Sequence, residues 1–560
     1  PYTGIRKQKE VHPMKEMSAR RQRRIEKILY RDRRGKALIY NRIFLTGLAM
    51  LLQITLATGI LVLLYRENSQ IATILTLLSN FIGFLMLLHI INRNDKPSGK
   101  LNWVILLLTL PVFGVLMFFL YGDGRPTKKM NRKIVAEKEK NKAAYPAVPL
   151  FNPVSETFGE APATAENSAD SAPLRGTTKY LSEYAGYPTS FDGDATYFPS
   201  GKETFDAIME AVRGAKKFIL AEYFIIAPGK TWETFLKALL EKAEEGVAVR
   251  LIFDNAGCLK ALPPKYDRYV ESLHPNIKCL TFNPISPVFT VRINNRDHRK
   301  QIIVDGETAF TGGINLADEY VGEKIRFGNW KDCGLRVTGS AVNTFTMMFF
   351  NIWNAFRKDK DDVSLFYSQK SAEKAQKIER CEAAEFPAFM QPYDDSPLDK
   401  ESVSETVYLD VINRAERYVW IYTPYLILDD ELRTALRSAA KRGIDVRIVI
   451  PGIPDKKLTY RLTKANVPPL LKAGVKVYTY TPGFIHAKSI LADDRFAVIG
   501  TVNFDYRSLC LNFENAVYFS DCSVADELKK DCVSTFPVCH AVTKEDLRDN
   551  WFRHFGDSLL

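Results

Sequence analysis

Two stretches of this sequence carry the same set of chemically active side chains at the same spacing. Each contains a histidine, a lysine two residues later and an aspartate five residues after the lysine: His298, Lys300 and Asp305 in the first copy, and His486, Lys488 and Asp493 in the second. Side chains two positions apart on a strand point to the same face, so we expect each histidine and its lysine to project together. The residues between lysine and aspartate are mostly apolar, as a buried strand requires.

A glycine-containing turn and an asparagine follow each motif. Gly312-Gly313 precedes Asn315, and Gly500-Thr501 precedes Asn503, so the asparagine lies 17 residues after the histidine in both copies. Glycine allows a tight turn and a close backbone approach, which would let the asparagine project into a site. One His-x-Lys pair would mean little, because an isolated histidine is usually structural. Two of only seven histidines occupy matching positions here, which indicates a functional site.

Each motif belongs to a longer internal repeat of strand, helix and strand. The apolar runs and helical patterns of the two copies lie at 217–226, 231–245 and 249–254, and at 417–425, 430–442 and 446–450. Gly246 and Gly443 follow the two helices as stop signals. Strand-helix-strand units predict parallel strands and an α/β class, with helices on both faces of each sheet.

Three long apolar segments precede the repeat, at residues 43–65, 71–91 and 101–121. The first has 23 uncharged residues, which at about 1.5 Å per residue can span a hydrocarbon core of roughly 30 Å. A cleaved signal peptide does not explain three consecutive runs, and a buried core helix would show one polar face. We therefore expect two to three membrane-spanning helices. Basic residues on both sides of this region leave open which membrane face carries the rest of the chain.

The chain divides into six parts: a basic segment at 1–42, the apolar region at 43–122, a charged, helical segment and linker at 123–175, a first globular lobe at 176–368, a connector at 369–400 and a second lobe at 401–560. Lys and Arg number 77 against 65 Asp and Glu, a net charge of +12 that suits nucleic acid or acidic lipid. The arginines before the first apolar run favour lipid head groups. Eight scattered cysteines form no Cys-x-x-Cys pair, which argues against a zinc or redox site.

The two motifs resemble the HKD motif that occurs twice in the phospholipase D superfamily. Residues 312–320, 330–332 and 500–514, together with the apolar stretch 111–122, are similar to bacterial cardiolipin synthases. The resemblance covers residues 43–122 and 176–560, whereas the linker at 146–175 has no clear counterpart. It implies two α/β lobes related by pseudo-twofold symmetry, with mixed sheets flanked by helices and one site at their interface.

The same resemblance implies transfer of a phosphatidyl group through a phosphohistidine, with phosphatidylglycerol as substrate and with no metal or cofactor. His298 is expected to attack phosphorus and His486 to act as acid and base, although the near-symmetry leaves an exchange of these roles open. The residues expected to hold the phosphoryl oxygens are Lys300, Lys488, Asn315 and Asn503. Asp332 and Glu514 would each orient one histidine. Asp305 and Asp493 complete the catalytic motifs and are expected to support the fold near the site.

The acceptor of the phosphatidyl group decides which reaction the chain would catalyse. Transfer to water would make the chain a phospholipase D that produces phosphatidic acid, whereas transfer to a second phosphatidylglycerol would give cardiolipin and glycerol. The apolar segments favour the lipid acceptor and a multi-pass protein of the bacterial cell membrane. We expect phosphatidylglycerol and other anionic membrane lipids as partners, and no nucleic acid; the sequence is compatible with a homo-oligomer.

Three other readings fit the sequence less well. A phosphatidylserine synthase of the same superfamily would need a cytidine nucleotide site, and no motif indicates one. A nuclease would fit the basic charge but not the apolar segments. Intact histidines and lysines in both copies argue against an inert membrane scaffold.

Overall fold

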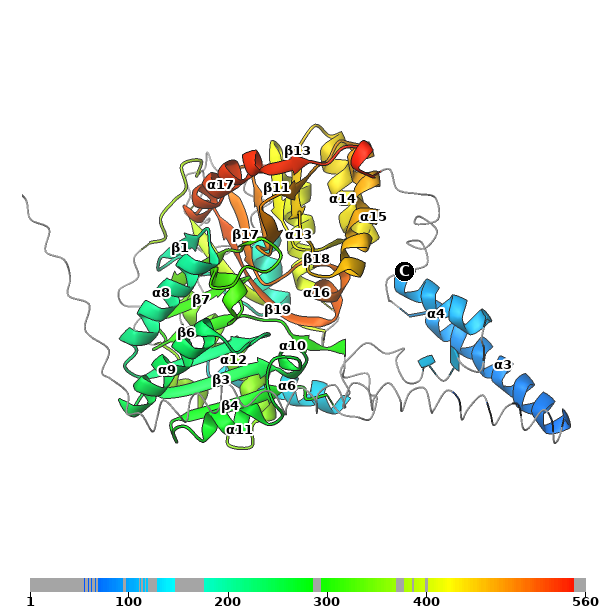
Figure 1. Cartoon of the computed structure of the whole chain (residues 1–560), viewed down its shortest axis with the longest axis horizontal. Helices are drawn as coiled ribbons and strands as arrows, with labels where there is room; N and C mark the ends of the chain where they lie inside the picture. Colours follow the sequence, from blue (N-terminus) through cyan, green and yellow to red (C-terminus); the bar gives the residue numbers. More distant parts are fainter. Residues whose placement is uncertain are drawn as a thin grey trace, which may run out of the picture.

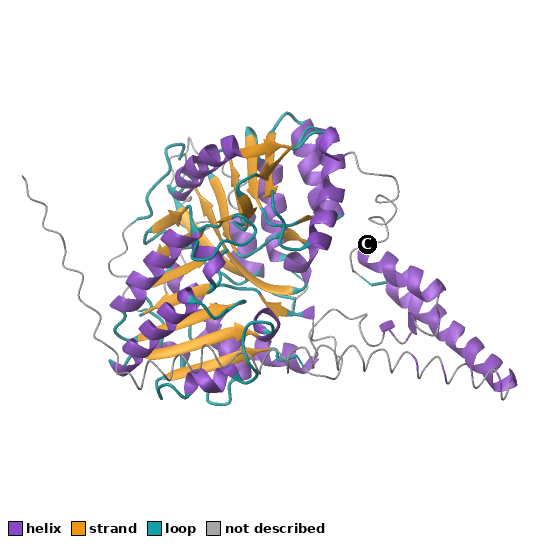
Figure 2. Ribbon diagram, in the orientation of Figure 1, coloured by secondary structure: helices purple, strands orange, loops and turns teal. Residues whose placement is uncertain are grey.

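Two α/β lobes and a separate pair of helices make up the described part of the chain (Figure 1). The computed structural model describes residues 69–93, 97–109, 128–146, 176–285, 294–368, 377–384, 387–397 and 401–547, with isolated positions between 55 and 118. The predicted basic segment 1–42 and nearly all of the first apolar segment lie outside these residues. Figure 2 shows the strands of both lobes as sheets with helices packed on their faces.

Lobe 1 is built on a seven-stranded mixed sheet in the order β1-β9-β7-β6-β2-β3-β4. Its strands are β1 (Ala195–Phe198), β2 (Phe218–Tyr223), β3 (Ala248–Asp254), β4 (Ile277–Phe282), β6 (Gln301–Val304), β7 (Thr308–Gly312) and β9 (Gly334–Thr338). Strands β2, β3 and β4 are parallel, and the other neighbours are antiparallel. The main helices are α8 (Gly201–Gly214), α9 (Lys230–Glu244), α11 (Tyr266–Glu271) and α12 (Ala341–Phe356).

Lobe 2 repeats this order with one strand added at its edge, as β10-β19-β17-β16-β11-β13-β14-β20. Its strands are β10 (Phe389–Asp395), β11 (Tyr418–Tyr422), β13 (Asp445–Pro451), β14 (Lys476–Tyr480), β16 (Ser489–Ala492), β17 (Phe496–Gly500), β19 (Asn512–Ser520) and β20 (Cys539–Ala541). The main helices are α13 (Val403–Arg414), α14 (Asp430–Lys441), α15 (Lys457–Ala473) and α17 (Val524–Thr535). Strands β11, β13 and β14 are the parallel set of this lobe.

The predicted strand-helix-strand repeat is confirmed in both lobes. It corresponds to β2, α9 and β3 in lobe 1, and to β11, α14 and β13 in lobe 2. Gly246 and Gly443 follow the two helices with φ of 96° and 94°, a left-handed conformation that other residues adopt only at a cost. The two glycines therefore end the helices and return the chain to the sheet.

One hydrophobic core runs through both lobes, and α12 is buried at its centre. Phe345 and Trp353 of α12 are fully buried, and they belong to the same hydrophobic cluster as side chains from strands of both sheets. Helix α6 (Lys128–Ala143), which lies in the segment predicted to be charged and helical, packs on α12 through Met130 and Ile134. Burial of each large apolar side chain contributes about 1.5–3 kcal/mol, so this shared core holds the two lobes together as one body.

The helix pair α3 (Ser69–Ile91) and α4 (Pro97–Thr109) covers the second predicted membrane segment and part of the third. The two helices contact one another through Met86, Ile90 and Leu107. Within the described residues, none of the helices combines the length and apolarity needed to cross a bilayer. The prediction of two to three membrane-spanning helices is therefore not confirmed by the fold.

Candidate active site

Two short pairs of parallel strands cross from one lobe to the other and position the two histidines. Strand β5 (Arg296–Asp297) of lobe 1 pairs with the start of β19, and β15 (Gly483–Ile485) of lobe 2 pairs with β8 (Asn329–Lys331) of lobe 1. The pairing continues one residue further, because the His298 amide donates to the Phe513 carbonyl (2.9 Å) and the His486 amide to the Lys331 carbonyl (2.7 Å). Each histidine therefore lies beside the residue that follows the last paired residue of the opposite strand, Phe513 of β19 or Lys331 of β8.

That neighbouring residue is a carboxylate in both cases. Nδ1 of His298 lies 2.8 Å from Oε2 of Glu514, and Nδ1 of His486 lies 2.7 Å from Oδ2 of Asp332. All four side chains are buried. A carboxylate at Nδ1 fixes the orientation of an imidazole ring and leaves Nε2 as the nitrogen that can react. The structure thus brings each predicted histidine together with the predicted carboxylate from the opposite lobe.

The two carboxylates are held by different neighbours. Glu514 accepts hydrogen bonds from Thr501 Oγ1 (2.6 Å) and Asn512 Nδ2 (3.1 Å). Asp332 accepts one from the Cys333 amide (2.8 Å) and packs against Gly313, where a Cβ atom would overlap its carboxylate. Gly313 and Thr501 occupy equivalent positions in the repeat. The glycine therefore leaves room for one carboxylate, whereas the threonine donates to the other.

The lysine of each motif folds back toward its own histidine. Lys300 Nζ donates to the carbonyl of His298 (2.7 Å). Lys488 Nζ donates to the carbonyl of His486 and also lies 2.9 Å from Nδ1 of the same ring. Because one nitrogen cannot donate to Asp332 and accept from Lys488 at the same time, the tautomer of His486 selects between these two contacts.

Burial lowers the pKa of all four groups. The pKa of His298 falls to about 4 and that of His486 to about 3, because loss of water disfavours the charged ring. Burial also lowers the pKa of Lys300 to about 7 and that of Lys488 to about 8. Lys488 contributes to the shift of His298, and Lys300 to that of His486. The two motifs thus form one electrostatic unit, in which both rings are neutral at pH 7.

The predicted asparagines flank this unit and are anchored within their own lobes. Asn315 donates from Nδ2 to the hydroxyl of Tyr320 (2.8 Å) and accepts from the Ile225 amide (3.0 Å). Asn503 donates from Nδ2 to Oγ of Ser508 (3.1 Å). Each amide nitrogen has a second hydrogen that these bonds do not use. Asn315 is therefore fixed in position while it keeps a donor, whereas the Asn503 amide also interacts with the Asp505 carboxylate.

Asp305 and Asp493 lie at the far end of the strands that the motifs enter. The carboxylate of Asp305 accepts from the amides of Lys216, Lys217 and Phe218 (2.7–2.9 Å). Asp493 caps the equivalent amides of residues 416–418 (2.8–2.9 Å). Seven residues of extended chain, up to about 23 Å, separate each aspartate from its histidine. The structure therefore does not bring these two members of the predicted catalytic set to the histidines; they tie the motif to the start of β2 and β11.

Aromatic rings around the histidines were not identified as site residues from the sequence. The Phe224 ring lies 4.9 Å from that of His298, while Tyr320, Trp330 and Phe484 lie 5.2, 5.6 and 5.8 Å from that of His486. Tyr320 and Trp330 belong to the stretches that carried the family resemblance, whereas nothing in the sequence singles out the two phenylalanines. These rings exclude water and contribute to the burial that lowers the histidine pKa values.

Arg299, between His298 and Lys300, was also not identified as a site residue from the sequence. Its fully buried guanidinium contacts Glu222 (2.7 Å), Asp297 (3.1 Å) and the lobe 2 residue Asp394 (3.4 Å), and it donates to the Met348 carbonyl (3.1 Å). Three carboxylates around one arginine hold its charge inside the core and keep its pKa above the ordinary range despite burial. The equivalent residue of lobe 2 is Ala487, so repeat symmetry gave no signal for this network.

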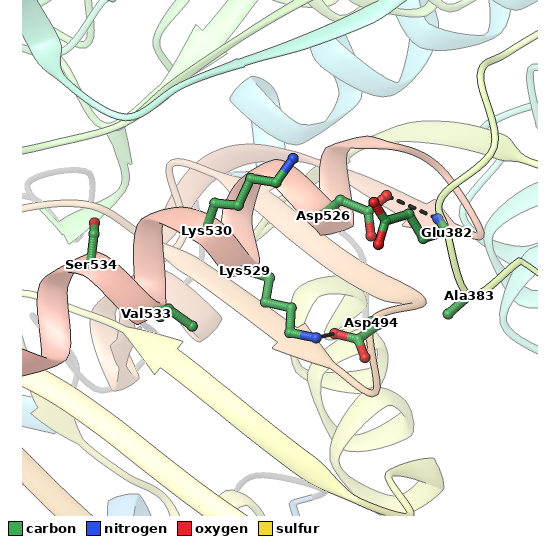
Figure 3. A pocket seen from close by; sticks show the side chains of 8 residues that line it. All are labelled: Glu382, Ala383, Asp494, Asp526, Lys529, Lys530, Val533 and Ser534. Atoms are coloured by element: carbon green, nitrogen blue, oxygen red, sulfur yellow. Dashed lines mark hydrogen bonds and ion pairs between the residues drawn. The ribbon is translucent and has the colours of Figure 1, made fainter.

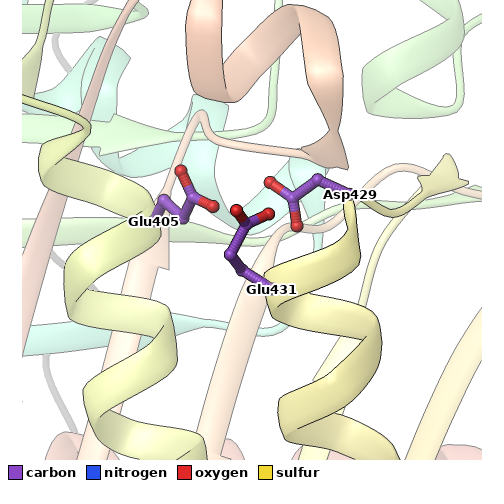
Figure 4. A group of neighbouring side chains, drawn as sticks. All are labelled: Glu405, Asp429 and Glu431. Atoms are coloured by element: carbon purple, nitrogen blue, oxygen red, sulfur yellow. The ribbon is translucent and has the colours of Figure 1, made fainter. Parts of the chain in front are cut away.

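A separate group of carboxylates lies on lobe 2, outside the histidine site. Glu405 of α13 approaches Asp429 and Glu431 at the start of α14, with oxygens within 4.8 Å of one another (Figure 4). The Asp429 carboxylate accepts from the Leu432 amide (3.0 Å), which makes it the N-cap of α14. Negative charge is stabilised at a helix N-terminus, so a structural role accounts for Asp429 and Glu431.

Comparison with known proteins places this site in a family. The chain matches the family profile "Cardiolipin synthase, PLD-like domain" at residues 206–325 and 408–534, and the profile "Phospholipase_D-nuclease N-terminal" at 75–122. An uncharacterised protein of Streptococcus mutans is 38% identical over 463 residues, which cover 82% of this chain and 95% of the relative.

Two named relatives are cardiolipin synthases. That of Alkalihalophilus pseudofirmus is 31% identical over 83% of this chain and 87% of its own length. The cardiolipin synthase of Halalkalibacterium halodurans is 30% identical over 86% of this chain and 90% of its own length. Among solved structures, a phosphatidylserine synthase of Haemophilus influenzae superposes with a TM-score of 0.53 at 15% identity, over 68% of this chain and 98% of that one. This last likeness concerns the fold alone.

The contact between Gly313 and Asp332 can be tested with Gly313→Ala. The backbone of Gly313 has no positive φ, so alanine is tolerated there, but its methyl group must displace the carboxylate that holds His486. A misplacement of about 1 Å can lower a rate about 100-fold, and we expect a loss of this size in kcat, with a lower thermal midpoint because the displaced carboxylate is buried, but with a folded protein by circular dichroism. Gly214→Ala, where the methyl group meets nothing within 4 Å, is the control. Full turnover in Gly313→Ala would show that the Asp332 position is unimportant.

Proposed function

The chain belongs to the cardiolipin synthase family of phospholipase D-like proteins, and we propose that it transfers a phosphatidyl group from one phosphatidylglycerol to another, releasing glycerol and forming cardiolipin. The observation that carries this proposal is the pair of histidine–carboxylate contacts, His298 with Glu514 and His486 with Asp332, each made between opposite lobes. Two such histidines supply a nucleophile and a proton donor to one phosphodiester.

In the first proposed step, Nε2 of His298 attacks phosphorus and the bond to the glycerol oxygen breaks. His486 gives its proton to that oxygen, and glycerol leaves. In the second step, His486 removes a proton from the hydroxyl of a second phosphatidylglycerol, whose oxygen then displaces His298 from phosphorus. The same bond types are broken and formed, so the exchange needs no nucleotide. The near-symmetry of the two lobes also permits the roles of the histidines to be exchanged.

The protonation states that these two reaction steps require follow from the burial of the histidines and from the charges near them. The low pKa of His298 keeps its ring neutral and nucleophilic at pH 7. His486 must bind a proton to act as an acid, and a phosphodiester anion beside the ring would raise its pKa from the low value of the empty site. Lys300 and Lys488 would stabilise the negative oxygens of the transition state, together with the amides of Asn315 and Asn503.

Association with the bilayer is proposed for the helix pair α3–α4. Its outward surface carries a continuous set of exposed apolar side chains: Ile71, Ile74, Leu77, Leu78, Phe81, Phe84, Leu85, Leu88, Ile91, Leu101, Ile105 and Leu108. An exposed apolar surface of this extent is typical of a membrane contact. It would hold the site where both lipid substrates are concentrated, which favours the transferase over the alternative of a phospholipase D that hydrolyses the phosphatidyl intermediate.

A flotation assay tests the membrane contact. The full chain is expected to float with phosphatidylcholine vesicles, and Phe81→Lys/Phe84→Lys to float much less. Burial of two aromatic side chains contributes about 3–6 kcal/mol, which corresponds to more than a 100-fold change in partition. Ile325→Lys, which replaces an exposed apolar residue of lobe 1, is the matched control. Equal flotation of the double variant and the control would exclude α3 as the contact.

A product assay tests the reaction. Full-length protein with phosphatidylglycerol, EDTA and no nucleotide is expected to give cardiolipin and glycerol in equal amounts. His298→Ala and His486→Ala should each reduce the rate of cardiolipin formation by more than about 1,000-fold, because the two histidines act as a unit. His540→Ala, at an exposed histidine, should have no effect. Phosphatidic acid without cardiolipin would support the hydrolase instead, and substantial turnover by either active-site variant would rule out a shared site.

The lysine pKa values predict the dependence of the rate on pH. Lys300 and Lys488 are protonated below about pH 7 and 8 and lose their charges as the pH rises through these values. Because kcat/KM reports the free enzyme, it should fall above this range, whereas kcat should fall at higher pH since the bound anion retains the protons. A kcat/KM that stays constant up to about pH 10, the ordinary lysine value, would contradict the assigned role of the lysines.

A further inference from the structure

A cavity of about 530 Å³ opens between α6 and the end of α12, away from the histidine site. It is lined mainly by cationic side chains from both elements: Lys129, Arg132, Lys133, Ala136, Glu137, Ala355, Arg357 and Lys360. Five cations face one carboxylate in this lining. No role in the proposed reaction requires these residues.

The wall formed by α6 is rigid. Met130, Ile134 and Asn141 lie on one stripe of the helix and are buried against α12. Asn141 Nδ2 donates to Oδ1 of Asn351 (2.9 Å), and its carbonyl accepts from the Tyr367 hydroxyl (3.0 Å). Because this stripe is docked, the exposed side chains at 129, 132 and 133 are held beside it, where they line the cavity together with the end of α12.

The cations of the cavity differ in how they are compensated. Arg357 pairs with Glu271 (2.6 Å) and Asp359 (2.7 Å), and Lys360 pairs with Glu137 (2.5 Å). The described residues offer Lys129 and Lys133 no carboxylate within ion-pair distance. Positive charge therefore remains at the mouth of the cavity, where an external anion can approach.

We propose that this cavity binds the phosphate of an anionic phospholipid head group, as a second lipid site distinct from the catalytic one. The inference rests on the proposed membrane contact of α3–α4. Figure 1 shows α6 at the edge of lobe 1, on the side from which that helix pair extends. With α3–α4 in the bilayer, α6 would lie near the head groups, and each basic side chain near an anionic surface adds about a fivefold preference. The site would orient the catalytic body on anionic regions of the membrane.

A second surface cavity, of about 590 Å³, has a different character (Figure 3). It lies along α17 and is lined by Glu382, Ala383, Asp494, Asp526, Lys529, Lys530, Val533 and Ser534. Lys529 pairs with Asp494 (2.7 Å), and Asp526 accepts from the Glu382 amide (3.0 Å). Its three carboxylates outnumber its two lysines, so it does not select an anion.

The test compares partition of the full chain between phosphatidylcholine vesicles with and without one-fifth phosphatidic acid. Phosphatidic acid has no head-group alcohol to release and cannot act as the donor, so the result does not depend on turnover. The ratio of the two partition coefficients cancels the contribution of α3–α4. We expect phosphatidic acid to raise wild-type partition at least tenfold, and Lys129→Gln/Lys133→Gln to lose most of this gain while it keeps wild-type cardiolipin formation in detergent micelles.

The matched control is Lys441→Gln/Lys472→Gln, which removes the same charge from exposed positions of α14 and α15. This control variant should keep the wild-type increase in partition that phosphatidic acid causes. Retention of the gain by the first double variant, or equal loss in both, would overturn the proposal. Absence of any wild-type gain with phosphatidic acid, together with binding of inorganic phosphate that Lys129→Gln/Lys133→Gln abolishes, would assign the cavity to free phosphate rather than lipid and would likewise overturn the proposal. Absence of cardiolipin formation in the wild type would refute the proposed function without affecting this comparison.

Discussion

The parallel pairing of two short strands across the lobes is the constraint on which the rest of the site depends. In the register of β5 with β19, the residue after Asp297 lies beside the residue after Phe513, and the same holds for β15 with β8. A histidine stands at one of these positions and a carboxylate at the other. Neither lobe can complete its own histidine, because the oriented ring and the group that orients it are always on different lobes. The shared core around α12 keeps the lobes in this arrangement.

Much of the framework could be predicted from the sequence because the repeat is local. The histidines, lysines and asparagines recur at fixed spacing, and the strand-helix-strand pattern of each lobe lies within about 40 residues of chain. The orienting carboxylates are different, since Glu514 is 216 residues from His298 and Asp332 is 154 from His486. No periodicity links residues at such distances, and only the family resemblance identified them. Phe224, Phe484 and the contacts of Arg299 had no signal of either kind, because packing between distant elements creates them.

The two halves of the site are similar but not equivalent, and the differences have physical consequences. Arg299 fixes the backbone between His298 and Lys300 through carboxylates of both lobes, whereas Ala487 leaves lobe 2 without such an anchor. Lys488 approaches Nδ1 of His486, while Lys300 reaches the His298 carbonyl and lies over the Phe224 ring. His486 is also surrounded by three aromatic rings and has the lower pKa. A repeat with nearly the same motif thus provides two histidines in different environments, as the two different roles in the proposed reaction require.

The central claim is that both lobes together form one reaction centre per chain. The measurement that tests it most directly is the number of phosphatidyl groups bound covalently to the protein when turnover with labelled phosphatidylglycerol is stopped by denaturation and analysed by mass spectrometry. The account predicts no more than one group per chain, always on the same histidine. Two groups on one chain, at His298 and His486 together, would show that each lobe reacts independently and would contradict it.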